Sequence, residues 1–202
     1  MAAFGGVIIR LNLARPVEEG VILDILAEGF EEIEALCPLD LMRRAGLEAK
    51  TVGVGGEYIT GAHAITVRAD MTDAEVGASE IRKADMIFLP GGMPGTLNLG
   101  ACETVRDAIR SAAEDKKYIA AICAAPSILG DMGLLLGKEA ICYPGFEKQL
   151  VGATISEKRV VLDGNILTAA GMGAALDMGL AIVEIFCGKE KASSLRSAVI
   201  AD

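Results

Sequence analysis

Short apolar runs alternate with amphipathic segments from Val21 onward, which is typical of strands that are each followed by a helix. Strands are predicted at 21–27, 48–55, 85–89, 118–123 and 139–144. Helices are predicted at 31–46, at 103–117, from Pro126 onward and at 174–188, and hairpins at 57–70 and 158–170. Because the central runs are apolar throughout, we expect an α/β fold: a three-layer sandwich in which helices cover both faces of a doubly wound, mostly parallel sheet.

The length of 202 residues suits one such domain. We assign residues 20–202 to it and expect residues 1–19 to be a disordered N-terminal extension. No apolar run approaches the roughly 18 residues that a membrane span needs, and the first residues lack the features of a secretory signal. We therefore expect a cytoplasmic protein with no membrane partner.

Charge and cysteine content argue against three further classes of protein: nucleic-acid binders, disulfide-stabilised proteins and zinc proteins. The formal net charge is −9 and no basic cluster follows a predicted face, so we expect no nucleic-acid partner. The five cysteines are odd in number and include no Cys-x-x-Cys pair, which favours free thiols in a reducing compartment over a disulfide framework or a zinc site. We expect neither a metal nor a cofactor.

Candidate chemistry gathers where three predicted strands end, since ligands of open α/β sheets bind beyond the carboxyl ends of the strands. The first strand leads to Glu31 and Glu34, the strand at 85–89 ends in Pro90-Gly91-Gly92, and the strand at 118–123 ends on Cys123. If these strands are neighbours, their ends line one crevice.

Cys123 lies between a buried strand and a helix that opens near Pro126. The start of a helix carries partial positive charge and free N–H groups, so we expect a lowered thiol pKa. Small residues allow a sharp turn here, and the N–H groups of Ala124 and Gly92 could form an oxyanion pocket. The alternative is that Cys123 is a small buried apolar side chain.

Glu34 is flanked by apolar residues and can point inward, where burial would raise its pKa and let it share a proton with a thiolate. The alternative is that glutamates in a first helical turn only interact with the helix dipole. His63 lies in a hairpin segment, and no spacing brings it to Cys123.

Four blocks of sequence carry a family resemblance: ILAEGFEEIEALCPLDLMRRAG, IFLPGGMPGTLNL, YIAAICAAPSIL and ILTAAGMGAALDMGLAIVEIFCGKE. In the same order over residues 20–202, they resemble the ThiJ/PfpI superfamily, in the branch of the parkinsonism-associated protein deglycase and of bacterial relatives named for thiazole biosynthesis. The resemblance implies a flavodoxin-like homodimer with a nucleophile at a strained elbow. It implies that Cys123 is this nucleophile, that a protonated Glu34 hydrogen-bonds it, and that Gly92 and Ala124 are backbone donors.

The chain also departs from these relatives. Ala124 stands where protease and amidotransferase members have a histidine, and Tyr143 stands where the deglycase has one. A Cys-His-acid triad is therefore excluded. Relatives show an arginine, a proline and a threonine where this chain has Ala170, Met172 and Ala174, which changes one wall of the pocket.

We expect a cofactor-independent enzyme of the glyoxalase III or deglycase type, acting on small reactive dicarbonyls such as methylglyoxal. Its catalytic residues would be Cys123 and Glu34, and further candidate pocket residues are Glu31, Gly91, Tyr143 and Met172. The alternative is a redox-responsive stress protein or chaperone, whose cysteine is oxidised to a sulfinate without turnover. A role in thiazole phosphate synthesis is less well supported, because no phosphate-binding glycine loop with a lysine is present.

Overall fold

The computed structural model describes residues 20–201, so the expected extension at 1–19 lies outside the described residues. The main sheet has seven strands in the order β10-β11-β7-β6-β1-β2-β5, and all its neighbouring strands are parallel except the β10–β11 pair. Its strands are β1 (Val21–Leu26), β2 (Glu48–Gly53), β5 (Met71–Thr72), β6 (Met86–Leu89), β7 (Tyr118–Ile122), β10 (Val160–Asp163) and β11 (Ile166–Ala169). The predicted doubly wound sheet is confirmed.

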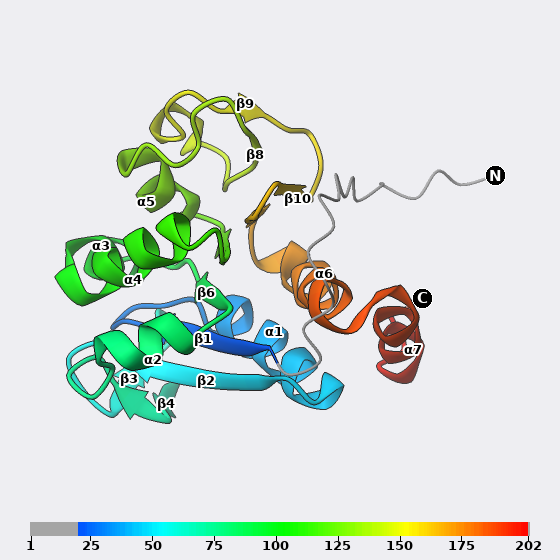
Figure 1. Cartoon of the computed structure of the whole chain (residues 1–202), viewed down its shortest axis with the longest axis horizontal. Coiled ribbons are helices and arrows are strands. Elements are labelled where there is room, and N and C mark those ends of the chain that lie inside the picture. The colour runs from blue at the N-terminus through cyan, green and yellow to red at the C-terminus, as the bar shows by residue number, and fades with distance from the viewer. Residues whose placement is uncertain (1–19, 202) are drawn as a thin grey trace.

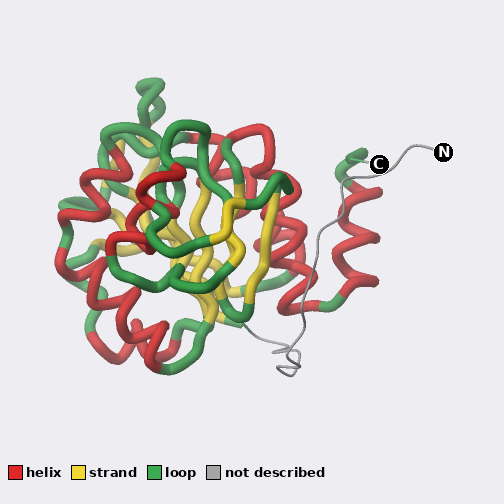
Figure 2. The backbone as a smooth tube through the Cα atoms, turned by 90° about the horizontal axis from the view of Figure 1, so that it is seen from above, coloured by secondary structure: helices red, strands yellow, loops and turns green. Residues whose placement is uncertain are grey.

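Helices cover both faces of this sheet, and Figure 2 shows the strands standing between them. The helices are α1 (Glu32–Ala45), α2 (Ala78–Lys83), α3 (Gly95–Ala101), α4 (Glu103–Glu114), α5 (Pro126–Asp131), α6 (Ala175–Cys187) and α7 (Lys189–Ala198). One apolar core joins α4 and α5 to the sheet, and a second joins α1 and α6 to its other face. In Figure 1, α7 extends beyond α6, on which it packs.

The first helix shows how the sequence fixes an element. Glu31 caps α1 by accepting the Glu34 N–H at 2.7 Å. Arg43 and Arg44 lie in the last turn, where their positive charges interact favourably with the negative end of the helix dipole. Gly46 ends the helix with φ at 93°, a left-handed conformation that glycine adopts without strain. The predicted helix at 31–46 is therefore confirmed to within a residue at either end.

Both predicted hairpins are present. β3 (Tyr58–Thr60) pairs antiparallel with β4 (Thr66–Arg68), and β10 pairs antiparallel with β11.

The strand predicted at 139–144 is wrong in length and place. Only β8 (Glu139–Ala140) forms, and it pairs with β9 (Thr154–Ile155) outside the main sheet. The chain leaves the strand because the next backbone donors bond elsewhere: the Ile141 N–H to the Thr168 hydroxyl and the Tyr143 N–H to the Cys123 carbonyl. This turn away from β9 brings the backbone of Tyr143 to that of Cys123.

Several short elements were not predicted. These are the strands β5 and β9, the helices α2, α3 and α7, and the one-turn 3₁₀ helices at Glu147–Gln149 and Met172–Ala174. Glycines and polar residues weaken the periodic signal in most of these segments, and their structure depends on tertiary packing.

Among residues 20–201, no helix has the length and apolar character that crossing a membrane requires.

Candidate functional site

The site lies where β1, β6 and β7 end side by side, because β6 pairs with both of the other strands. The expectation that these strands are neighbours is therefore confirmed, and their three carboxyl ends lie at one edge of the sheet. β7 delivers Cys123, the loop after β6 delivers Gly91 and Gly92, and the first turn of α1 delivers Glu34.

Cys123 occupies a sharp elbow between β7 and α5, with φ at +64°. Such a conformation is strained for a residue with a side chain, by about 1–3 kcal/mol, and persists only where the surroundings hold it. Three backbone hydrogen bonds do so here: Cys123 N–H to Ala169 O at 2.9 Å, Tyr143 N–H to Cys123 O at 2.8 Å, and Ala125 N–H to Ile122 O at 3.0 Å. The elbow leaves the cysteine partly exposed between buried neighbours.

Glu34 points inward, and only 1% of its surface is exposed. Its carboxyl accepts the Gly91 N–H at 3.1 Å and the Met172 N–H, and it shares a hydrogen bond with the Cys123 thiol. The burial of Glu34 therefore agrees with the expectation that its side chain points inward, rather than lying on the helix surface.

The electrostatics of this pair differ from the expectation. Burial raises the pKa of Glu34 to about 7, the hydrogen bond from Cys123 opposes the shift, and the charge of Glu31 adds to it. Burial and then the Glu34 carboxylate raise the pKa of the Cys123 thiol to about 12, while the N–H groups of Ala124 and Gly92 lower it.

The predicted low thiol pKa is thus wrong, because desolvation and a neighbouring carboxylate outweigh the backbone donors. The helix that was expected to stabilise the thiolate, α5, has only six residues. The first proton leaves the pair from Glu34 near neutrality, and the thiol keeps its own proton to much higher pH.

Glycine is required beside the pair. A Cβ atom on Gly91 would lie 2.5 Å from Glu34 Oε2 and 2.7 Å from the Cys123 Cβ. Gly92 has φ at 93° and, with Ala124, places its backbone N–H against the sulfur. These are the two groups that the sequence suggested as donors.

Tyr143 and Met172, two of the further pocket residues suggested by the sequence, lie at the same site. A Cβ atom on Gly171 would be 3.2 Å from Tyr143 Cδ2 and 3.8 Å from Glu34 Oε1, so the ring and the carboxyl border one gap. The sequence analysis missed Gly171, although a glycine directly after a strand that ends beside the thiol is a usable signal.

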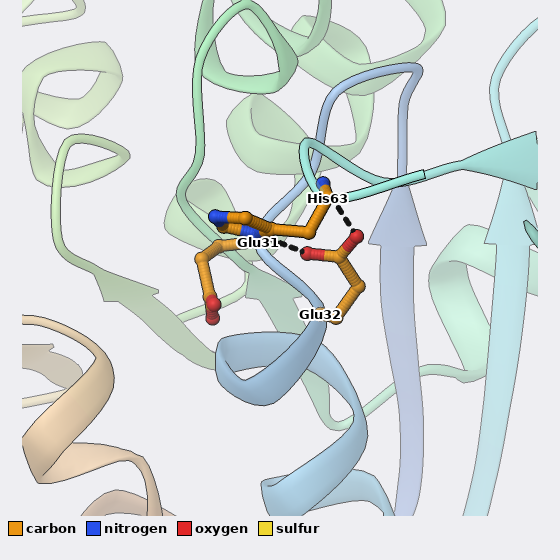
Figure 3. Close-up of side chains that lie close together, drawn as sticks. All are labelled: Glu31, Glu32 and His63. Carbon is orange, nitrogen blue, oxygen red and sulfur yellow. Dashed lines mark hydrogen bonds and ion pairs between the residues drawn. The ribbon is translucent and has the colours of Figure 1, made fainter. Parts of the chain in front are cut away.

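His63 was not linked to the site by sequence, and it packs against α1 instead. The buried Glu32 carboxylate accepts the His63 backbone N–H at 2.7 Å and lies 2.8 Å from His63 Nδ1 (Figure 3). Potential metal-ligand atoms of Glu31, Glu32 and His63 lie within 4.8 Å of one another. Each carboxylate already accepts a hydrogen bond, Glu31 from the Glu34 N–H of its own helix and Glu32 from His63. The Glu32–His63 contacts therefore connect α1 to the β3–β4 hairpin.

Comparison with known proteins gives the family. The DJ-1/PfpI family model matches residues 21–185. The chain is 36% identical to protein dj-1beta of Drosophila melanogaster over 181 residues, which is 88% of this chain and 95% of the relative. It is 27% identical over 179 residues to a Caenorhabditis elegans protein named glutathione-independent glyoxalase DJR-1.2, covering 88% of this chain and 94% of the relative.

A solved structure supports the same grouping. Oxidised DJ-1 of Toxoplasma gondii superposes with a TM-score of 0.84 at 31% identity, covering 90% of this chain and 98% of that one. Sequence and fold agree over nearly the whole described chain, which therefore belongs to the DJ-1/PfpI family.

Proposed function

We propose that this protein is a cofactor-independent cysteine enzyme that converts reactive dicarbonyls to hydroxy acids. One observation carries the proposal: a nearly fully buried carboxyl with a pKa of about 7 is hydrogen-bonded to a partly exposed thiol at a strained elbow. A general base works best when its pKa lies near the operating pH. The relative that is named a glyoxalase supports this chemistry.

Attack begins with the thiol. As the sulfur of Cys123 adds to the aldehyde carbon of methylglyoxal, the thiol proton passes to the Glu34 carboxylate. Glu34 then gives this proton to the former aldehyde oxygen, which completes a hemithioacetal and leaves the carboxylate ionised for the next step. The developing oxyanion is placed to accept hydrogen bonds from the N–H groups of Gly92 and Ala124. This route does not require a thiolate in the resting enzyme.

A proton transfer within the substrate follows. Glu34 removes the proton from the former aldehyde carbon and the adjacent ketone carbon regains one, which gives a thioester of the hydroxy acid. Water then cleaves the carbon–sulfur bond, releasing lactate and regenerating the thiol. One dicarbonyl and one water thus give one hydroxy acid, with no external oxidant or reductant. On glycated amines or thiols, the same chemistry would appear as deglycase activity.

A second candidate is a redox sensor, favoured by the related structure from Toxoplasma gondii that is described as oxidised. Two equivalents of peroxide would convert the Cys123 thiol to a sulfinate and release two waters. Glu34 and the N–H groups of Gly92 and Ala124 would then hold the sulfinate oxygens.

Methylglyoxal conversion by the wild type, Cys123→Ser and Glu34→Gln tests the proposal, with intact mass measured after mild peroxide treatment. We expect turnover by the wild type and a loss of at least about 100-fold in each variant. Cys102→Ser is the matched control and should keep full turnover, since Cys102 lies beside Asp73, outside the site.

The outcomes separate the two candidates. A wild type that converts no dicarbonyl, but gains two oxygen atoms at Cys123, would favour the sensor. Unchanged turnover in Cys123→Ser would overturn the assignment of the nucleophile.

A further inference from the structure

Two large apolar side chains border the Cys123–Glu34 pair and remain half exposed. Tyr143 is 51% exposed and Met172 is 53% exposed. Each is fixed to the pair through its backbone, since the Tyr143 N–H bonds to the Cys123 carbonyl and the Met172 N–H bonds to Glu34. The backbone of each residue is thus anchored beside the reacting groups, and each side chain is half exposed there.

The Tyr143 ring faces the site. It lies close to Gly171 on the side where the Glu34 carboxyl also approaches, and the missing side chain at Gly171 keeps this gap open. A substituent attached to a carbon bound at Cys123 would therefore meet the edge of the Tyr143 ring, rather than water alone.

The charges around the pair are negative. Glu31 and Glu34 are both carboxyl groups, and no arginine or lysine within residues 20–201 forms an ion pair with either. Arg159 reaches the loop that carries Met172, but its guanidinium donates to the Gly173 carbonyl and pairs with Asp177 at 3.5 Å. The imidazole of His63, which lies near Glu31, is already paired with Glu32 at 2.8 Å, so an anionic substituent would mainly meet carboxyl groups.

From these contacts we propose that the preferred substrates are 2-oxoaldehydes with an uncharged aryl or branched alkyl substituent, ahead of glyoxal and of dicarbonyls that carry a carboxylate. This inference rests on the proposed function. Burying an apolar substituent against Tyr143 and Met172 favours its transition state, and one such pocket contact changes kcat/KM by about 10- to 200-fold.

The test compares glyoxal, phenylglyoxal and 4-carboxyphenylglyoxal in the wild type, Tyr143→Ala, Tyr143→Phe and Met172→Ala. The measured quantity is the ratio of kcat/KM for phenylglyoxal to that for glyoxal, because comparing this ratio between variants cancels the intrinsic reactivity of each compound. Leu136→Ala is the matched control: Leu136 is 77% exposed and packs at Gly152, away from the thiol.

We expect the ratio to fall about tenfold in Tyr143→Ala and in Met172→Ala, and to be kept in Tyr143→Phe and Leu136→Ala. In the wild type, 4-carboxyphenylglyoxal should react at least about tenfold less efficiently than phenylglyoxal. Equal efficiency with these two compounds, or a ratio that both alanine variants leave unchanged while glyoxal still reacts, would overturn the substrate inference alone. No turnover of any of the three compounds by the wild type would overturn the proposed function itself.

Discussion

At the scale of single residues, the site is a pair of groups whose ionisation is coupled. Glu34 and Cys123 share a hydrogen bond in a place where water is largely excluded, so each proton that leaves affects the other group. The carboxyl ionises first, with a pKa of about 7, and its charge then helps to keep the thiol protonated. In the proposed reaction, the base beside the sulfur therefore activates it, rather than a low pKa of the thiol itself.

This coupling predicts the pH dependence of the proposed reaction. Below pH 7 Glu34 is protonated and cannot accept the thiol proton, so kcat/KM should rise with pH through an apparent pKa near 7. Because the charge of Glu31 raises the pKa of Glu34, Glu31→Gln should move the rise to lower pH. Steady-state kinetics between about pH 5 and 9 measure both effects. A flat profile, or a rise that starts only above pH 9, would contradict the role of Glu34 as base.

A single methyl group tests the packing of the pair. Gly91→Ala places a Cβ atom against both Glu34 Oε2 and the Cys123 Cβ, so the carboxyl and thiol must move apart. We expect kcat/KM for methylglyoxal to fall about 100-fold or more, with the circular dichroism spectrum retained. Gly56→Ala is the matched control, because a Cβ atom there meets nothing within 4 Å. Full activity in Gly91→Ala would mean that the reaction does not need this geometry.

At the scale of elements, β1 contains a residue that conflicts with its surroundings. Asp24 lies on the face of the strand that packs against α1, it is fully buried, and neither of its carboxyl oxygens has a hydrogen-bond partner. Burial raises its pKa well above the ordinary value, Arg43 opposes the shift and Asp70 adds to it. A strand that is otherwise apolar therefore holds in its middle a carboxyl whose neutral form is favoured by burial.

Replacing this carboxyl should stabilise the protein. Asp24→Val removes an unsatisfied buried polar group, and we expect the free energy of unfolding to rise by about 1–3 kcal/mol. The unfolded chain ionises Asp24 at a lower pH than the native state does, so wild-type stability falls as pH rises above about 4, and the advantage of the variant should grow.

Urea unfolding at several pH values measures this effect, and Asp24→Asn separates its two causes. The asparagine variant should lose the pH dependence that Asp24 contributes while keeping a buried polar group. A valine variant that is less stable than the wild type at every pH would contradict this account.

At the scale of the whole molecule, two apolar cores on opposite faces of one sheet hold the three loops of the site at a common edge. The isolated chain still exposes several large apolar side chains, among them Ile33 at 50% and Val151 at 62%. Exposed apolar surface of this kind is often covered by a second protein molecule.

We expect a homodimer, as the family resemblance implies. Light scattering coupled to size-exclusion chromatography should give a mass near twice the 21.0 kDa of the chain. The dimer should persist on dilution to micromolar concentration, since a stable dimer needs a well-packed interface. A mass of one chain at all concentrations would contradict this expectation.

The amino-acid pattern alone determined the class of fold and the position of the thiol. The alternation of apolar runs and amphipathic segments fixed the order of most strands and helices, because burial on one or both sides leaves a local period in the sequence. The inward direction of Glu34 followed from the apolar residues on either side of it, and the small residues around Cys123 marked the elbow.

Only the tertiary structure decided what surrounds these residues. Three features bring together segments that are far apart in the chain. They are the adjacency of β1, β6 and β7, the hydrogen bond between the backbones of Tyr143 and Cys123, and the gap at Gly171 between the Tyr143 ring and Glu34. The pKa of Cys123 was predicted in the wrong direction for the same reason. A local sequence shows the start of a helix, but ionisation depends on water, charges and hydrogen bonds contributed by residues that meet only when the chain is folded.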